Sequence, residues 1–170
     1  LKDLNIYFDY LTQDRERNLK NENINIIINE LIENFNKELK DKNIEVEKKL
    51  GLLHETSIDR REFYIVMEKL LINAIESIEK DGEILISTEL KEDVEPGEIL
   101  VTISDNGKGI DPEHENHIFE PFFTTKSACL GLGLNIAKII IEFYDGKIDF
   151  SRNKTGGVSF HLRLPVNKVV

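Results

Sequence analysis

The sequence contains a single cysteine, Cys129, which excludes an intramolecular disulfide and a zinc site built from cysteines. No apolar run approaches the roughly 20 residues that a membrane-spanning helix needs, and the N-terminus lacks the layout of a signal peptide. With 10 glycines, 4 prolines and no internal repeat, the chain is neither a linker nor a low-complexity segment. We therefore expect a folded domain in the reducing cytoplasm, and the start at Leu1 suggests a fragment whose parent could be membrane-anchored.

Basic residues are fewer than acidic ones: the chain has 22 Lys and Arg against 32 Asp and Glu, which gives a formal net charge of −10. A general nucleic-acid binder needs a basic face that displaces counterions from phosphates, so no nucleic-acid partner is expected. An acidic protein can still hold an anionic ligand with backbone amides and one or two lysines. The length of 170 residues, 40% of them hydrophobic, suits one globular domain.

The hydrophobic pattern predicts an α+β fold. Helical spacing covers residues 1–12, 23–41, 59–79 and 132–144, and strands are expected at 44–50, 83–88, 99–104, 147–152 and 158–164. This order of helices and hairpin-linked strands predicts a two-layer α/β sandwich with a mixed, mostly antiparallel sheet and helices on one face.

The segment "ISDNGKGI" places Asp105 and two glycines, Gly107 and Gly109, directly after an expected buried strand. A plain hairpin needs at most one such glycine, so the turn has either a tight local geometry or a second purpose. Residues 105–130 have no clear period and are long for a structureless connection in a compact domain. We therefore expect a functional loop or lid in this stretch.

Polar groups in three other segments suggest a phosphate ligand. Asn73 lies inside an expected helix near the edge of its apolar stripe, where a buried amide needs a partner such as a cation or water. "FFTTK" ends in two hydroxyls and Lys126. Gly131 and Gly133 precede a helix, whose backbone amides and dipole can hold phosphates. Each feature alone also has a purely structural explanation, and it is their common order that indicates a nucleotide site.

In this order the motifs resemble the nucleotide-binding domain of the GHKL superfamily, shared by gyrase, heat-shock chaperones, mismatch-repair ATPases and sensor histidine kinases. "FEPFFTTK" and "GLGL" are similar to bacterial sensor histidine kinases in particular, and the resemblance covers about residues 22–168. It implies the GHKL (Bergerat) type of fold, with ATP and Mg²⁺ as cofactors. Residues 21–170 would form the ATP-binding kinase domain, and residues 1–20 the end of a dimerisation helix with a connector.

The resemblance also implies individual roles. Asn73 would bind the magnesium that bridges the phosphates, and Asp105 would accept a hydrogen bond from the adenine amino group. Gly107 and Gly109 would let the base lie against the backbone. Ile110 and Phe119 would be apolar neighbours of the nucleotide, and Thr125 and Lys126 would contact it from the lid. Gly131, Leu132 and Gly133 would offer backbone amides to the phosphates. Asn73 and Lys126 are the implied catalytic residues.

Two positions depart from the family pattern. Where the family often has another Asn, and gyrase-type hydrolases a water-activating Glu, this chain has Lys69. An ammonium has no lone pair to accept a proton, so Lys69 argues against efficient hydrolysis. The glycine-rich run, commonly Gly-Thr-Gly-Leu-Gly-Leu, begins here with Cys129 and Leu130, which removes one glycine and one hydroxyl. The effect of that change on lid closure stays open.

None of the 4 histidines suits a phosphoacceptor, which such kinases carry on an upstream dimerisation helix. His54 follows an expected strand in a loop, His114 and His117 lie in the lid region, and His161 lies in the last strand. The acceptor would therefore be outside this chain.

The main hypothesis is the catalytic domain of a two-component sensor histidine kinase. It would transfer the γ-phosphoryl of ATP to a His on its own upstream dimerisation and phosphoacceptor domain, which then serves a response regulator receiver domain. The parent would be a homodimer and this chain a monomer. An anti-sigma-type serine kinase is one alternative, although its lid rarely reads "FEPFFTTK". A degenerate, nucleotide-gated binding module is another, and Cys129-Leu130 is the feature that favours it.

Overall fold

A five-stranded mixed sheet forms one layer of the molecule in the computed structural model, which describes residues 2–12, 16–93, 97–127 and 129–166. The strand order is β2-β4-β5-β7-β6, with bounds β2 Ile44–Leu50, β4 Gly82–Lys91, β5 Glu98–Asp105, β6 Lys147–Arg152 and β7 Val158–Pro165. Only β2 and β4 pair in parallel, and the other neighbours are antiparallel. The predicted α+β class with a mostly antiparallel sheet is confirmed.

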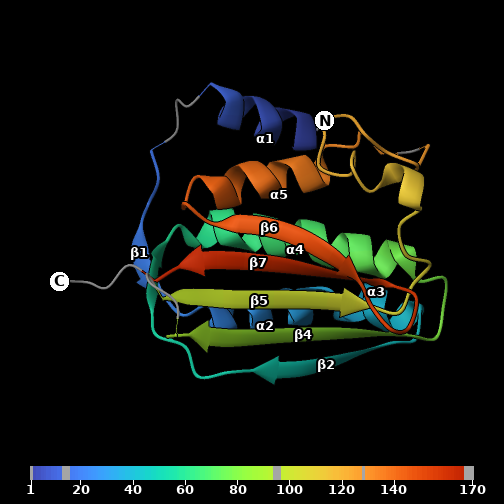
Figure 1. Cartoon of the computed structure of the whole chain (residues 1–170), viewed down its shortest axis with the longest axis horizontal. Coiled ribbons are helices and arrows are strands. Elements are labelled where there is room, and N and C mark those ends of the chain that lie inside the picture. Colours follow the sequence, from blue (N-terminus) through green and yellow to red (C-terminus); the bar gives the residue numbers. More distant parts are fainter. Residues whose placement is uncertain (1, 13–15, 94–96, 128, 167–170) are drawn as a thin grey trace.

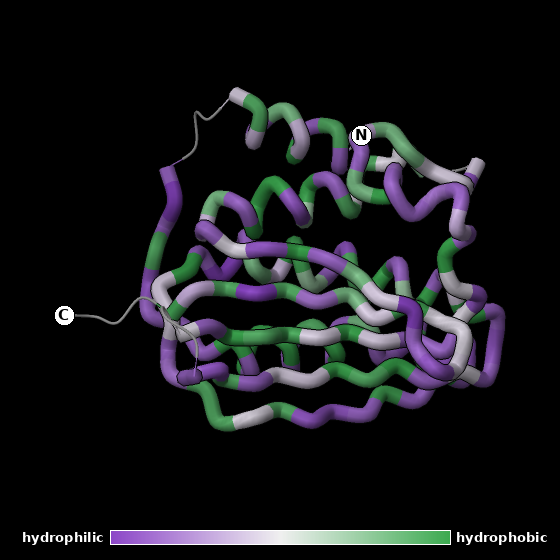
Figure 2. The backbone as a smooth tube through the Cα atoms, viewed as in Figure 1, coloured by the Kyte–Doolittle hydropathy of each residue, from purple (hydrophilic) through white to green (hydrophobic). Residues whose placement is uncertain are grey.

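Helices cover one face of this sheet, as Figure 1 shows. The helices in the described ranges are α1 Lys2–Leu11, α2 Ile24–Asn34, α3 Asn36–Asp41, α4 Arg60–Ser77, the short 3₁₀ helix η1 Pro112–His114, and α5 Gly133–Glu142. Of these, α1 lies on α5 and η1 lies in the lid. Burial alternates along β5, where Ile99, Val101 and Ile103 are buried and Thr102 is not. In Figure 2 hydrophobic residues recur along strands and helices. One strand face thus packs on the helices while the other stays polar.

The expected helix over residues 23–41 is divided at Phe35, which is a correction to the sequence prediction. Phe35 has φ −94° and ψ 7°, outside regular helix geometry, and separates α2 from α3. Asparagines flank it at positions 34 and 36, and their side chains compete for backbone hydrogen bonds. The expected start is right, because the Asn23 side chain accepts from the Asn25 amide at 3.0 Å and caps α2.

A small antiparallel sheet that the sequence did not predict joins β1, Lys20–Glu22, to β3, Thr56–Ile58. Strands this short show no usable period. A hydrogen bond between residues that flank the two strands stabilises their pairing, since the Asn18 amide donates to the Asp59 carboxylate at 2.9 Å. Asp59 also caps α4 through the Arg61 amide, so the connector after α1 is attached to the start of α4.

The helix α1 packs on α5 (Figure 1). Its Ile6, Tyr7 and Tyr10 side chains are buried, and Tyr10 lies 6.2 Å from the Phe143 ring at the end of α5. A division of the chain at residue 20 into a helix remnant and a kinase domain stays a prediction. Among the helices in the described ranges, none is both long and apolar enough to cross a membrane.

Candidate functional site

Asp105 ends β5 as a buried carboxylate, with 5% of its surface exposed. Its Oδ1 accepts hydrogen bonds from the Ser77 hydroxyl at 2.8 Å and from the Gly107 amide at 2.9 Å. Burial raises the pKa of Asp105, while the bonds from Ser77, Gly107 and Val158 act in the lowering direction. A carboxylate has about four acceptor positions, so capacity remains for a further donor.

Ser77 is a site residue that the sequence prediction missed. It is the last residue of α4 and lies one helical turn beyond Asn73 on the same side of that helix. That i, i+4 spacing, followed by a strand ending in Asp105, was the available signal. Asn153, in the turn between β6 and β7, was also missed, and its side-chain amide donates to the Asp105 carbonyl at 2.6 Å.

The two glycines after Asp105 lie against protein groups. A Cβ atom at Gly107 would lie 2.1 Å from the Ser77 hydroxyl oxygen. Gly109 has φ +75°, and its Cβ would lie 2.5 Å from the Gly156 carbonyl oxygen. Close packing against α4 and the β6–β7 hairpin thus requires both glycines. Their predicted contact with a base stays a prediction.

Asn73 lies on α4 one turn from the residue that Lys126 contacts. Asn73 is half-buried, and its side chain forms no hydrogen bond with the residues that the structure describes. The Lys126 ammonium, from the lid, forms an ion pair with Glu76, which lies three residues beyond Asn73. A lid cation therefore reaches the turn of α4 that carries the predicted magnesium ligand.

The start of α5 offers unpaired amides. Gly133 is its first residue, and the N-cap residue Leu132 is buried and makes no side-chain cap hydrogen bond. The first amides of such a helix have no intrahelical partner and attract anions. Gly131 has φ +68°, and a Cβ there would lie 2.4 Å from the Phe123 carbonyl oxygen, so the lid packs directly on this turn.

We expect Gly131→Ala to destabilise the fold more than Gly156→Ala does. Both glycines have positive φ, which costs about 1–2 kcal/mol for alanine. Only Gly131 has a close neighbour, since nothing lies within 4 Å of a Cβ at Gly156. Overpacking should add at least about 1 kcal/mol at Gly131. Urea unfolding measures both, and equal losses would contradict the packing of the lid on this turn.

Phe119 lies in an aromatic cluster. Its ring is 6.4 Å from Phe150 and 6.3 Å from Phe160 on the helix-facing side of the sheet. Its carbonyl accepts from the Asn135 side-chain amide of α5 at 2.8 Å. Asn135, missed in the sequence, therefore ties the first part of the lid to α5, and its Oδ1 is buried without a partner among the described residues.

Two more predicted residues contribute less. Ile110 is partly buried against the core. The Thr125 side chain is exposed and makes no hydrogen bond within the described part of the chain, whereas the neighbouring Thr124 hydroxyl accepts from the Lys126 amide at 3.0 Å. The predicted contact of these residues with a nucleotide is not tested by their packing.

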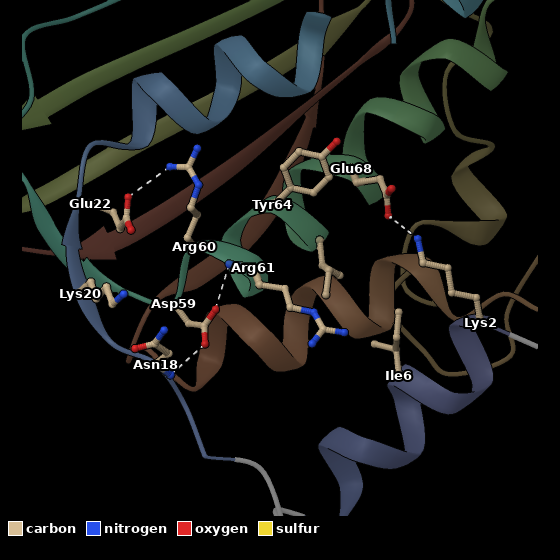
Figure 3. Close-up of a pocket in the computed structure, with 11 residues that line it drawn as sticks. Lys2, Ile6, Asn18, Lys20, Glu22, Asp59, Arg60, Arg61, Tyr64 and Glu68 are labelled. Carbon is tan, nitrogen blue, oxygen red and sulfur yellow. Dashed lines mark hydrogen bonds and ion pairs between the residues drawn. The ribbon is translucent and has the colours of Figure 1, made fainter. Parts of the chain in front are cut away.

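The larger of two cavities does not contain the predicted nucleotide-binding residues. A groove of about 560 Å³ lies between α1, the connector and the start of α4, and Figure 3 shows its charged lining, which includes Lys2, Arg60, Arg61 and Glu68. It contains none of the predicted nucleotide residues. A smaller cavity of about 270 Å³ borders Ser77 and Gly107. The buried Asp105 carboxylate bonds two residues that line this second cavity, Ser77 and Gly107, and the half-buried Asn73 lies on the same helix as Ser77. The chemistry of these groups therefore favours the smaller cavity.

The histidines lie where the sequence predicted. His54 is exposed in a loop, 3.7 Å from Glu92, and His114 lies in η1. His117 lies in the lid, and His161 lies in β7, where Thr102 contacts its Nδ1 at 3.1 Å. All four lie outside the α-helices.

Residues 58–168 match the family of histidine kinase-, DNA gyrase B- and HSP90-like ATPases. The signal transduction histidine-protein kinase AtoS of Escherichia coli (strain K12) is 37% identical over 115 residues, which cover 68% of this chain and 18% of AtoS. The chain thus spans less than a fifth of that relative.

Solved structures agree with the sequence comparison. The nucleotide-free catalytic domain of the histidine kinase ThkA has a TM-score of 0.77 and 32% identity, covering 87% of this chain and 95% of that one. ThkA in complex with the response regulator protein TrrA has a TM-score of 0.77 and 29% identity, covering 98% of this chain and 48% of that one. The fold and the resemblance predicted from the motifs are therefore confirmed, and the chain belongs to the histidine kinase-, DNA gyrase B- and HSP90-like ATPase family.

Proposed function

We propose that this chain binds ATP and Mg²⁺ as the catalytic domain of a sensor histidine kinase and transfers the γ-phosphoryl group to a histidine outside the chain. The observation that supports this most is the arrangement around the end of α4. Ser77 bonds the buried Asp105, and Asn73 lies one turn earlier beside the lid pair of Lys126 and Glu76. One helix thus connects a base-reading carboxylate to groups suited to phosphates.

Asp105 would read the adenine amino group. A buried carboxylate accepts hydrogen bonds only, so it favours a base edge that presents a donor. The bonds from Ser77 and Gly107 hold its orientation before a base arrives. That rigidity lowers the cost of ordering a binding group.

Asn73 would hold the magnesium ion. Magnesium prefers oxygen ligands and keeps several waters, so one protein amide together with substrate phosphates is a sufficient donor set. The half-buried Asn73 amide, without a hydrogen-bond partner in the described ranges, fits this need. When bound, the ion would neutralise charge on the phosphate oxygens.

Phosphate binding would fall to the start of α5 and to Lys126. The amides from Gly131 to Gly133 are available because Leu132 provides no side-chain cap. Lys126 must leave Glu76 to meet a phosphate, and this exchange of anions would close the lid. Such a site supplies position and charge, which is what phosphoryl transfer asks of a protein.

The acceptor and the partners would lie beyond this chain. The likeness to ThkA, solved in complex with the response regulator TrrA, supports a response regulator receiver domain as the second partner. The first would be the dimerisation and phosphoacceptor domain of the parent, with residues 1–20 as its end. The parent would then be a homodimer that uses this domain in the cytoplasm.

The isolated chain should bind ATP with Mg²⁺ but neither label itself nor hydrolyse ATP quickly. We would incubate it with γ-labelled ATP, alone and joined to the helical hairpin that precedes it in the parent. The expected result is acid-labile label on the hairpin only, because the four histidines here lack the context of a dimerisation helix. Acid-stable label on a serine of the hairpin would favour the serine kinase. ATP binding without transfer to the hairpin would favour the nucleotide-gated module, and stable label on His54 would contradict the proposal.

A further inference from the structure

Lys69 lies on α4 close to the proposed nucleotide site, but it has no role in the magnesium site of Asn73 or in the adenine site of Asp105. It precedes Asn73 by four residues, so both side chains lie on one side of the helix. It is buried, with 7% of its surface exposed. Its Cδ atom lies 3.6 Å from the position of a Cβ at Gly133, so the lysine stem runs along the first residue of α5.

The Lys69 ammonium donates to the Asp3 carboxylate of α1 at 2.6 Å. A buried cation requires an anion, because an unpaired charge away from water strongly destabilises the fold. Two neighbouring carboxylates on α4 form ion pairs with other lysines, since Glu68 pairs with Lys2 at 3.6 Å and Glu76 pairs with Lys126. A carboxylate from α1, 66 residues away in sequence, therefore supplies the charge opposite Lys69.

The Lys69–Asp3 ion pair lies next to the elements that would bind the phosphates. Lys69 lies on α4 one turn before Asn73, and its stem packs against Gly133 at the uncapped start of α5, so it adjoins both elements that would hold a triphosphate. Figure 1 shows the N-terminal end of α1 at the side of the molecule where the lid reaches α5. Asp3 thus offers an anion at the site where the amides of α5 and a buried ammonium converge.

We propose that Lys69 is an additional phosphate-binding residue, and that Asp3 competes with the nucleotide phosphates for it. This inference rests on the proposed function. A phosphate that takes over the Lys69 ammonium weakens the hold of Asp3, so nucleotide binding and docking of the N-terminal end of α1 oppose each other. By linkage each process weakens the other by the same factor. Tyr7 extends this coupling to the lid, because its ring lies 5.8 Å from Phe122.

Lys69→Met tests the phosphate contact. Methionine keeps much of the apolar stem and removes the charge. Titration calorimetry with Mg²⁺ should show ATP affinity reduced by about tenfold or more, since a charge-assisted hydrogen bond is lost. Adenosine, which has no phosphate, should bind within about twofold of its wild-type affinity. A purely structural role would weaken both ligands equally, and that result would overturn the proposal.

Asp3→Asn tests the competition and leaves the core untouched. Without the competing carboxylate, ATP affinity should rise several-fold while adenosine affinity stays unchanged. In the Lys69→Met background the same substitution should bring no gain. Lys2→Met is the matched control, because it breaks the neighbouring pair of α1 with Glu68 (Figure 3). Lys2 is exposed, so this pair contributes little to the docking of α1, and ATP affinity should change much less than in Asp3→Asn.

The outcomes separate this inference from the proposed function. If the wild-type chain binds no ATP, the proposed function fails and this inference with it. If ATP binds in a manner that depends on Asp105, yet Asp3→Asn leaves its affinity unchanged or lower, only this inference fails. Should Lys69→Met not fold, Asp3→Asn decides alone, and Lys69→Arg, which retains the charge, should keep ATP affinity closer to wild type than any uncharged variant.

Discussion

Asp105→Asn should weaken ATP binding about tenfold to more than a hundredfold and leave the folded chain at neutral pH at least as stable as wild type. The loss has a direct cause, because the amide replaces an acceptor-only group with one that can present a donor to the adenine amino group. A charge-assisted hydrogen bond of this kind contributes roughly 1.5–3 kcal/mol. Titration calorimetry measures the affinity, and equal values for the two proteins would remove the adenine assignment.

The stability should change in the opposite direction to the affinity. Burial raises the pKa of Asp105 in the folded chain, so its ionised form costs stability at any pH above that raised value. The amide still accepts from Ser77 and Gly107 through its oxygen but carries no charge. Its advantage in unfolding free energy should be largest near neutral pH and fade as the pH falls through the raised pKa, where Asp105 takes up a proton.

Asp111→Asn is the matched control. Asp111 lies in the same loop and also accepts from a backbone amide two residues on, that of Glu113 at 3.0 Å. It is exposed, so removing its charge should leave the ATP affinity unchanged and alter the unfolding free energy much less than Asp105→Asn does. Urea unfolding at several pH values compares the three proteins. A stability advantage of Asp105→Asn that grows at low pH would contradict the assigned cause of the pKa shift.

Asn73→Ala should lower phosphoryl transfer to the upstream hairpin by at least about a hundredfold, the loss expected when a group that positions charge stabilisation is removed. Alanine is the better helix former, so α4 should remain folded. The ATP affinity should also lose most of its dependence on Mg²⁺. Asn73→Asp should retain more activity than Asn73→Ala, because a carboxylate is itself a magnesium ligand.

Labelling of the hairpin at fixed ATP, with and without Mg²⁺, measures these effects. Asn29→Ala is the control, since Asn29 is also a half-buried asparagine inside a helix and contacts Lys48 at 2.7 Å. It should leave transfer unchanged. Wild-type rates in Asn73→Ala, or an unaltered Mg²⁺ dependence, would exclude Asn73 as the metal ligand.

The sequence determined the parts of this protein that repeat over several turns or alternate over a whole strand. The expected helix over residues 59–79 is α4, Arg60–Ser77, and the alternating segment at residues 44–50 is β2 with the same bounds. A periodic hydrophobic pattern predicts both the type of element and the face of it that is buried. The order of the short motifs was equally local, and it identified the family before any fold was known.

Only the tertiary structure decided what the site residues contact. The sequence does not place Ser77 on Asp105, a separation of 28 residues, or pair Lys69 with Asp3, a separation of 66. The break at Phe35 and the short strands β1 and β3 were hidden for the same reason, since they lack periodic length and depend on neighbours. A period shows which face of a helix or strand is buried, but it does not show which distant side chain a residue meets. The partners of these residues are therefore set by how distant segments pack.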